Sequence, residues 1–189
     1  VSTVTVTYNR PEMIQKCVES LKTQSLKRDD YEIIVVNQGE DEVDVDVDSL
    51  IEAEDKGVAY GRNLGIKEAS GDLIAFIDDD CIAREDWLEK GLEELEENDW
   101  AGVEGQVEDD SDRIDEWMES DIWGFVTANI FYRKDVLEEV GLFDERFRPP
   151  ILREDTDLAW SVLELGEEIG SSEEVIVEHI GGESTKNWK

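Results

Sequence analysis

Three consecutive aspartates, Asp78, Asp79 and Asp80, directly follow the apolar run 73–77. A short apolar run of this kind predicts a strand buried on both faces, as in parallel sheets. Open α/β sheets bind ligands just beyond the carboxyl ends of their strands, where these side chains would lie. Adjacent carboxylates repel one another unless a cation joins them, and oxygen ligands suit Mg²⁺ or Mn²⁺ together with substrate phosphates. The triplet therefore indicates a divalent-metal site, with an ordinary acidic turn as the alternative in so acidic a chain.

The net charge restricts the partners. The 189 residues include 51 acidic and 18 basic side chains, a formal net charge of −33. Such a surface repels nucleic acid and anionic membranes, so we expect neither as a general partner. It also repels itself, and at about 1 M salt a Debye length of about 3 Å removes most of that repulsion. We interpret the charge as adaptation to a salt-rich cytoplasm. A nucleic-acid mimic is the alternative, disfavoured because the acids are spread along an ordinary α/β pattern.

The cysteines and apolar segments bear on the compartment. Cys17 and Cys81 form no CxxC pair, and with one histidine in the chain they cannot build a usual zinc site. No apolar run approaches the roughly 20 residues that cross a bilayer, and no signal-peptide pattern is present. We therefore expect a reducing cytoplasmic location, including the inner face of the membrane, and no transmembrane segment.

Strand and helix patterns alternate along the chain. A helix should open at Pro11 and bury Ile14, Cys17, Val18 and Leu21. The other expected helices are 57–69, 84–97 (Leu88, Leu92 and Leu95 inward), 134–140 and 155–165 (Leu158, Val162 and Leu165 inward). The expected strands are 1–8, 33–36, 50–53, 73–77, 101–107, 125–132 and 175–177. Residues 40–48 alternate acidic residues with valine, which predicts an edge strand or an exposed loop; the acids favour the loop. Residues 108–119 should form a polar loop or a short helix. This order predicts a mainly parallel α/β sheet flanked by helices, with a smaller mixed portion in the second half.

Three classes of site are disfavoured because their motifs are missing. No GxGxxG follows the first strand, as a dinucleotide-binding Rossmann domain would require, and no GxxxxGK[ST] P-loop occurs. No GxSxG elbow is present for a serine hydrolase.

An ordered set of motifs resembles the family 2 glycosyltransferases with the GT-A fold, over nearly the whole chain. The motifs are 4–11 (VTVTYNRP), 32–37 (EIIVVN), 56–65 (KGVAYGRNLG), 71–72 (GD), 78–80 (DDD), 140–147 (VGLFDERF) and 153–160 (REDTDLAW). Each piece is weak alone, whereas the ordered set is specific. The resemblance implies one GT-A domain over 1–189, with a nucleotide-sugar-binding half at 1–107 and an acceptor-binding half at 108–189.

For the donor side, the resemblance implies a nucleoside-diphosphate sugar held by Mn²⁺ or Mg²⁺. Asp80, with Asp78 directly or through water, would hold the metal, and Asp79 would contact the ribose or base. The other residues on the nucleotide side would be Thr7, Tyr8, Arg10, Asn37 and Arg62. A surface ion pair is the alternative for Arg62. Asn37 departs from the family, which usually has Asp there; an Asn can both donate to and accept from a base edge.

For catalysis, the resemblance gives Asp155 the role of general base and Glu154 that of an acceptor hydrogen-bonding residue. The alternative for either acid is a helix-terminal charge that favours the macrodipole by about 0.3–1 kcal/mol. Trp123, Thr127 and Asn129, with Trp117 nearby, would line the donor-sugar and acceptor pocket. His179 either reaches the metal, which would favour Mn²⁺, or is structural. Ser161 follows Trp160 where many relatives carry Arg, and no QxxRW occurs, which argues against a processive synthase.

These patterns predict a metal-dependent inverting glycosyltransferase that moves a sugar from a nucleoside-diphosphate sugar to a hydroxyl of a glycan or lipid-linked acceptor. A sugar-nucleotide nucleotidyltransferase is one alternative, although it would usually carry a Gly-rich basic segment after the first strand. A nucleotide-sugar-binding module without turnover is another, and Asn37 gives it some support.

Overall fold

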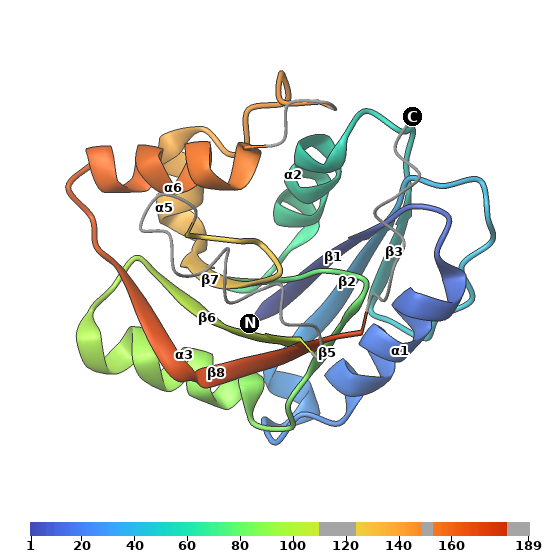
Figure 1. The fold of residues 1–189 in the computed structure, drawn as a ribbon, viewed down its shortest axis with the longest axis horizontal. Coiled ribbons are helices and arrows are strands. Elements are labelled where there is room, and N and C mark those ends of the chain that lie inside the picture. Colours follow the sequence, from blue (N-terminus) through green and yellow to red (C-terminus); the bar gives the residue numbers. More distant parts are fainter. Residues whose placement is uncertain (110–123, 149–152, 181–189) are drawn as a thin grey trace.

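The computed structural model describes residues 1–109, 124–148 and 153–180, which form one mixed sheet with helices on both faces (Figure 1). Its strands are β1 (Ser2–Thr7), β2 (Glu32–Asn37), β3 (Ser49–Glu52), β4 (Leu73–Ile77), β5 (Cys81–Ala83), β6 (Gly102–Asp109), β7 (Asn129–Arg133) and β8 (Ile169–His179). Its helices are α1 (Pro11–Lys22), the 3₁₀ helix η1 (Arg28–Asp30), α2 (Val58–Glu68), α3 (Trp87–Asn98), α5 (Lys134–Val140) and α6 (Glu154–Glu164). The strand order is β3-β2-β1-β4-β7-β6-β8-β5, so the predicted α/β class is confirmed.

The first half of the chain forms the parallel part of the sheet. β1 lies between β2 and β4 and is parallel to both, and β2 is also parallel to β3. The pairing of Thr7 with Asn37 aligns the ends of β1 and β2. Polar residues that follow these strands therefore meet at one edge, as the sequence predicts.

The second half adds strands of both directions. β7 is antiparallel to both β4 and β6, whereas β6 and β8 are parallel, with a bulge between Glu104 and Gln106. The short β5 pairs antiparallel with the end of β8, which brings Cys81 beside His179. This mixed portion agrees with the expected smaller addition to a parallel sheet.

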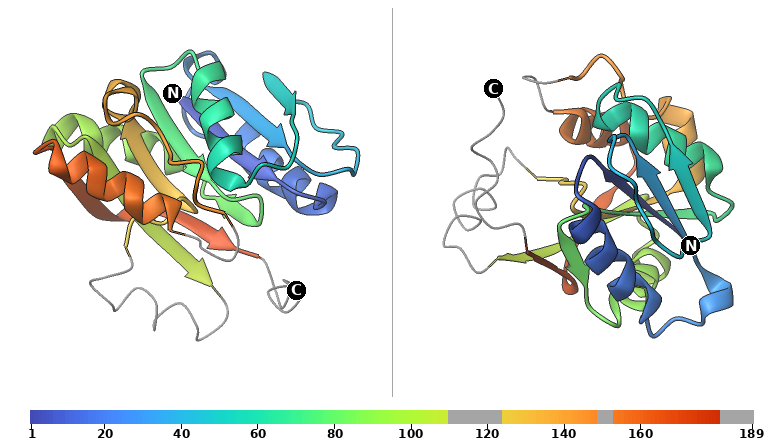
Figure 2. Two further views of the ribbon diagram at one scale, coloured as in Figure 1. Left: turned by 90° about the horizontal axis from the view of Figure 1, so that it is seen from above. Right: turned by 90° about the vertical axis from the view of Figure 1, so that its right-hand side faces the viewer.

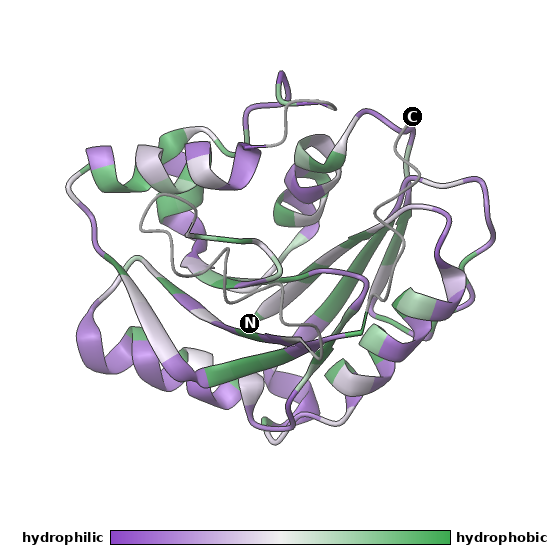
Figure 3. Cartoon of the chain, viewed as in Figure 1, coloured by the Kyte–Doolittle hydropathy of each residue, from purple (hydrophilic) through white to green (hydrophobic). Residues whose placement is uncertain are grey.

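Two apolar cores lie on opposite faces of the sheet. Helices α1 and α3 cover one face, whereas α2, α5 and α6 cover the other (Figures 1 and 2). Figure 3 shows hydrophobic strands at the centre and helices whose surfaces are partly hydrophilic. No helix in the described part of the chain is long and apolar enough to cross a membrane.

Two glycines let α2 approach the sheet closely. A Cβ at Gly65 would lie 2.3 Å from a methyl group of Val4, and one at Gly61 would lie 2.8 Å from Val6. Any side chain there would force the helix outward. This close packing sets the position of Arg62 at the edge of the sheet.

Several element boundaries differ from the sequence expectations. The strand expected at 125–132 begins only at Asn129, because the chain turns before it, with Phe125 at a positive φ of 74°. β8 starts at Ile169, well before the expected 175–177, and β5 was not expected. The helix expected at 84–97 begins at Trp87. The prediction that 40–48 form a loop is confirmed, since the structure has no strand there and β3 begins at Ser49. Residues 110–119 of the expected polar segment lie outside the described residues.

Two predicted core residues are less buried than expected. Leu92 is only partly buried on α3, although Leu88 and Leu95 are buried as predicted. Leu165 is 45% exposed because α6 ends one residue earlier, whereas Leu158 and Val162 are buried. The apolar stripe of α6 is therefore one residue shorter than its sequence pattern predicts.

Candidate active site

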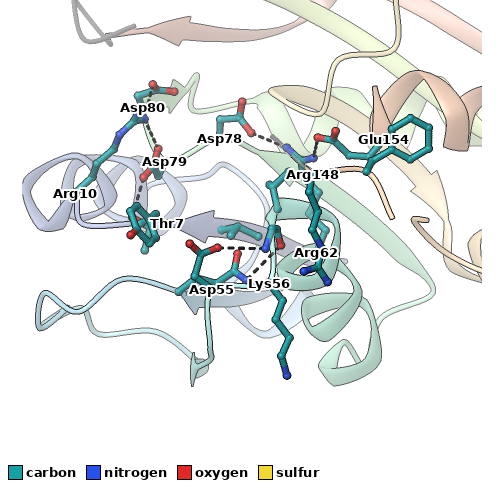
Figure 4. A pocket seen from close by; sticks show the side chains of 16 residues that line it. Thr7, Arg10, Asp55, Lys56, Arg62, Asp78, Asp79, Asp80, Arg148 and Glu154 are labelled. Atoms are coloured by element: carbon teal, nitrogen blue, oxygen red, sulfur yellow. Dashed lines mark hydrogen bonds and ion pairs between the residues drawn. The ribbon is translucent and has the colours of Figure 1, made fainter. Parts of the chain in front are cut away.

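A cavity of about 660 Å³ lies beyond the carboxyl ends of β1 and β4. β1 and β4 are neighbours, and the chain continues from β1 to one side and from β4 to the other. Such a reversal of strand order is where open α/β sheets bind ligands, and the volume suits a small molecule. The cavity is lined by Val6, Thr7, Tyr8, Arg10, Gln38, Asp55, Lys56, Gly57, Val58, Arg62, Asp78, Asp79, Asp80, Phe147, Arg148 and Glu154 (Figure 4).

The charge of the lining is close to balance, unlike that of the whole chain. Four basic residues stand with five acidic ones, although the chain has 18 basic and 51 acidic residues. The basic ones are Arg10, Lys56, Arg62 and Arg148. Positive charge gathered in a cleft raises the local concentration of an anionic ligand. The lining therefore repels an anion such as a diphosphate much less than the rest of this acidic chain does.

Arg10 joins two members of the aspartate triplet. Its Nη1 donates to Oδ1 of Asp79 at 3.0 Å and to Oδ2 of Asp80 at 2.9 Å (Figure 4). The Thr7 hydroxyl donates to the other oxygen of Asp79 at 2.7 Å. Desolvation still raises the pKa of Asp79 to about 6. Asp79 therefore orders Thr7 and Arg10 at the cavity wall, with both of its oxygens engaged.

Arg62 connects the two halves of the chain. It is 7% exposed on α2, and its Nη1 donates to Oε1 of Glu154 at 2.8 Å. Its Nη2 lies 3.4 Å from Asp78, and its guanidinium lies 5.6 Å from the centre of the Phe143 ring. Desolvation raises the pKa of Asp78, and Arg62 opposes that rise. The surface ion pair considered for Arg62 is excluded, because this pair is buried.

His179 lies beside the third aspartate. Its Nε2 is 3.5 Å from Oδ2 of Asp80, and the backbone N–H of Ile180 donates to the Asp80 carbonyl at 2.8 Å. Desolvation alone would raise the pKa of Asp80, but His179 and Arg10 outweigh it and hold that pKa below its usual value. The pairing of β5 with β8 is what brings these residues together.

The donor set fits a divalent metal that shares its coordination with a ligand. Within the described ranges, no three His, Cys, Asp or Glu side chains are already grouped for metal binding. Asp80 and His179 supply one oxygen and one nitrogen donor, with Asp78 on the same wall. Mg²⁺ commonly uses one or two carboxylates plus substrate phosphates, and an imidazole favours Mn²⁺. These residues can hold such an ion when phosphate oxygens complete the set.

Asp155 lies at the first turn of α6, next to the cavity residue Glu154. It is half-buried, and its Oδ1 accepts from the backbone N–H of Thr156 at 2.7 Å. Desolvation raises the pKa of Asp155, as does the charge of Glu154, and Arg62 opposes them. Its charge in turn raises the pKa of Asp78, which places it near the triplet. A partly desolvated carboxylate with a raised pKa suits a general base.

Glu154 is 6% exposed and its two oxygens are already engaged. Oε1 accepts from Arg62, and Oε2 accepts from the backbone N–H of Arg153 at 3.1 Å. Both contacts hold Glu154 in place within the protein. Because Glu154 also lines the cavity, it would lie beside a ligand bound there.

Other residues expected at the site lie elsewhere. Asn129 is fully buried, accepts from the Trp87 indole, donates to two backbone carbonyls and does not line this cavity, so its place in the sugar pocket stays a prediction. Thr127 is 4% exposed and does not line the cavity. Trp117 and Trp123 lie outside the described residues.

Tyr8 and Asn37 have contrasting positions. Tyr8 is 47% exposed and lines the cavity, whereas Asn37 is 2% exposed and does not. The Asn37 amide donates to Glu52 at 2.9 Å, and its oxygen accepts from the backbone N–H of Gly39 at 3.0 Å. The side chain that was expected to read the base therefore holds neighbouring loops in this structure.

Sequence reasoning gave no role to several residues that the structure places at or near the site. Gln38, Lys56 and Arg148 line the cavity, and Glu104 on β6 is close enough to Asp155 for that charge to raise the pKa of Glu104. The scarcity of basic residues could have indicated Lys56 and Arg148. Glu104 carried a weaker signal, namely a carboxylate inside an otherwise strand-like segment.

Comparison with known sequences identifies the family. The model of Glycosyl transferase family 2 matches residues 2–145. Glycosyltransferase AglE of Haloferax volcanii is 30% identical over 168 residues, covering 76% of this chain and 55% of AglE. The glucosyl-dolichyl phosphate glucuronosyltransferase of the same organism is 30% identical over 175 residues, covering 76% of this chain and 56% of its own. The chain thus spans about half the length of these relatives.

Comparison with solved structures supports the same architecture. The mannosyltransferase PcManGT from Pyrobaculum calidifontis, in complex with GDP-Man and Mn²⁺, superposes with a TM-score of 0.81 at 17% identity, over 97% of this chain and 57% of its own. S. aureus TarS 1–349 in complex with UDP superposes with a TM-score of 0.76 at 18% identity, over 94% and 59%. Since the family model covers most of the chain and the fold agrees, the chain belongs to glycosyl transferase family 2 and has the GT-A fold.

Proposed function

We propose that this chain is the catalytic domain of a metal-dependent, inverting glycosyltransferase. It transfers a hexosyl group from a nucleoside-diphosphate sugar to a hydroxyl of a glycan or lipid-linked acceptor. The observation that carries the proposal is the cavity at the ends of β1 and β4, where Arg10 and Arg62 stand among the three aspartates. On this proposal, residues 1–107 form most of the donor side, to which Arg148 and His179 also contribute, and 108–189 form the acceptor side.

The donor diphosphate fits the charge of the cavity. Arg10, Arg62 and Arg148 supply positive charge, and Tyr8 offers an exposed ring at the wall where a base can stack. Asp80 and His179, with Asp78, would hold Mn²⁺ or Mg²⁺. A bound divalent ion stabilises the negative charge that the leaving diphosphate acquires. The solved relatives named above are complexes with GDP-Man and with UDP, which supports testing both bases.

Transfer needs one base and no protein nucleophile. The acceptor hydroxyl oxygen forms a bond to the anomeric carbon while Asp155 takes its proton. The bond from that carbon to the diphosphate oxygen breaks, and the nucleoside diphosphate leaves with the electron pair. A single displacement of this kind inverts the anomeric centre. The half-buried position and raised pKa of Asp155 support this role.

The acceptor is proposed from the relatives. One relative is named as a transferase that acts on glucosyl-dolichyl phosphate, so sugars linked to polyprenyl phosphates are the first acceptors to test.

The test is a donor panel in molar KCl. GDP-, UDP- and dTDP-sugars are screened by thermal shift with Mn²⁺, Mg²⁺ or EDTA, and each donor that binds is assayed for transfer, for pyrophosphate exchange and for donor binding alone. We expect metal-dependent binding followed by transfer with inversion. Pyrophosphate exchange would instead indicate a nucleotidyltransferase. Binding to every donor without turnover on any acceptor would indicate a binding module.

A further inference from the structure

A carboxylate on a central strand holds the turn that precedes β7. Glu104 lies on β6, paired with Ile130 on β7 and Ser171 on β8. Its Oε1 accepts from the backbone N–H of Val126 at 2.8 Å and also from that of Phe125. Its Oε2 lies against the same turn, since a Cβ at Gly124 would be 3.3 Å from it. Bonds from an ionised carboxylate to backbone N–H groups are stronger than bonds between neutral groups.

The turn is strained, and that strain needs a support. Phe125 has a φ of 74°, a conformation that bulky residues rarely adopt. Strained backbone of this kind persists where surrounding contacts over-determine it, and it gathers at functional sites. Glu104 supplies one contact through the backbone, and the packing of the Phe125 side chain against the core under α6 supplies another.

The turn and the helix that carries the proposed base pack against the same apolar core. Phe125 packs against the core cluster that contains Leu158, one helical turn after Asp155. The charge of Asp155 adds to desolvation in raising the pKa of Glu104, and both charges act in the same way on Tyr132, whose buried hydroxyl has no hydrogen-bond partner among the described residues. The three residues come from β6, β7 and α6, and they are close enough for their charges to affect one another; α6 lies on the face of the sheet that also carries α2 and α5 (Figure 1).

We propose that Glu104 is a positioning residue for the acceptor: it holds the turn 124–126 in the conformation that walls the space in front of Asp155. The role rests on the proposed function, because it assigns the acceptor to this side of the base. Glu104 does not line the donor cavity, so its influence on donor binding is small. What Glu104 contributes is the position of one carboxylate oxygen, Oε1, which accepts from two backbone N–H groups of the turn.

Two variants separate the effect of side-chain length from the effect of charge. Glu104→Asp keeps the charge but shortens the side chain by one methylene. Glu104→Gln keeps the side-chain length and one acceptor oxygen but removes the charge. Glu108→Asp is the matched control, since Glu108 lies on the same strand with an exposed side chain paired to Arg84. For each protein we would measure backbone hydrogen exchange at residues 124–126, affinity for the donor nucleotide with Mn²⁺, and kcat and KM for the acceptor.

We expect Glu104→Asp to accelerate exchange in the turn and to raise the acceptor KM by about tenfold, the effect of losing one good hydrogen bond. Donor affinity should stay within about twofold of wild type, and Glu104→Gln should restore the acceptor KM to within about threefold. The proposal is overturned if Glu104→Asp leaves both exchange and KM unchanged, or if it weakens donor binding as much as acceptor use. Equal defects in the Asp and Gln variants would also overturn it. A wild-type protein that binds donors but transfers to no acceptor refutes the proposed function instead, and exchange in Glu104→Asp then decides whether Glu104 holds the turn.

Discussion

The cavity wall and the outer surface of this protein use charge in opposite ways. In the cavity, four basic and five acidic residues stand together, and Arg10 and Arg62 each contact two carboxylates. Across the whole chain, 51 acidic residues outnumber 18 basic ones. The acid excess is therefore a property of the surface, where salt can screen it. The cavity depends on specific pairs, of which the pair Arg62–Glu154 is buried from solvent.

Screening of the surface repulsion by salt should give the largest effect, a change in the stability of the folded state. Raising KCl from about 0.1 to 1 M shortens the Debye length from about 10 to 3 Å, which is less than the spacing of most surface acids. Because ordinary domains have a surplus of only about 5–15 kcal/mol, this change can decide whether the fold persists. We expect the melting temperature, followed by circular dichroism, to climb steeply with KCl. Sucrose of equal osmolality serves as the uncharged control. A melting temperature that is flat across this range would rule out the salt-adaptation reading.

The proposed base should give the next largest effect. Asp155→Asn should lower kcat by about 10²–10⁴-fold, the usual range for a positioned base, with donor affinity retained. The control is Asp157→Asn, an exposed acid in the same turn of α6. Because the pKa of Asp155 is raised, the wild-type rate should fall with decreasing pH above the usual range of an aspartate, since the protonated carboxyl cannot accept a proton. Near-normal transfer by Asp155→Asn at saturating substrates would show that another group is the base.

A buried and an exposed ion pair test the comparison directly. Arg62 and Glu154 form a pair whose side chains are 8% and 7% exposed, whereas Arg84 and Glu108 are 50% and 54% exposed. Glu154→Gln should lower the free energy of unfolding by up to about 3–5 kcal/mol, because it leaves the buried guanidinium with only the longer contact to the more exposed Asp78. Glu108→Gln should change it by about 0–1 kcal/mol. Urea titrations at fixed KCl measure both. Equal changes would show that the two regions do not differ as described.

Metal dependence should give a smaller but measurable effect. Asp80→Asn should weaken donor binding in the presence of Mn²⁺ by about 10–100-fold or more, since even indirect supports of a metal contribute that much. The matched variant is Asp55→Asn, another acid of the cavity wall that lies outside the aspartate triplet. Calorimetry with Mn²⁺ and with EDTA compares the proteins. Full-strength binding by wild type in EDTA would exclude the proposed role of the metal in holding the donor.

The smallest expected effect is the contribution of Asp79 to the pH dependence of the free energy of unfolding. Its pKa is raised to about 6, so as pH falls from about 6 toward the ordinary value near 4 the folded state binds the proton before the unfolded state does. This group therefore adds stability as pH falls, by up to about 1.4 kcal/mol per pH unit. We expect the difference in unfolding free energy between wild type and Asp79→Asn to show that slope between about pH 4 and 6. A constant difference across that range would contradict the raised pKa.

The sequence determined the donor side of this protein to a large extent. Apolar runs and helical periodicity predicted β1, β2 and β4, and the order of elements predicted a parallel arrangement, because these patterns follow from local backbone geometry. Once neighbouring strands are parallel, their carboxyl ends meet at one edge. The aspartate triplet, Thr7 and Arg10 had to lie close together there.

Only the tertiary structure decided the rest of the site. The antiparallel contact of β5 with β8 brought His179 to Asp80, and the packing of α2 buried Arg62 against Glu154, a residue 92 positions later. The same long-range packing placed Asn129 in the core and Glu104 under the turn 124–126. A local pattern shows that a polar residue is present in an element. Its partner is set by how elements far apart in the sequence pack, because hydrogen bonds and ion pairs act only over a few ångströms.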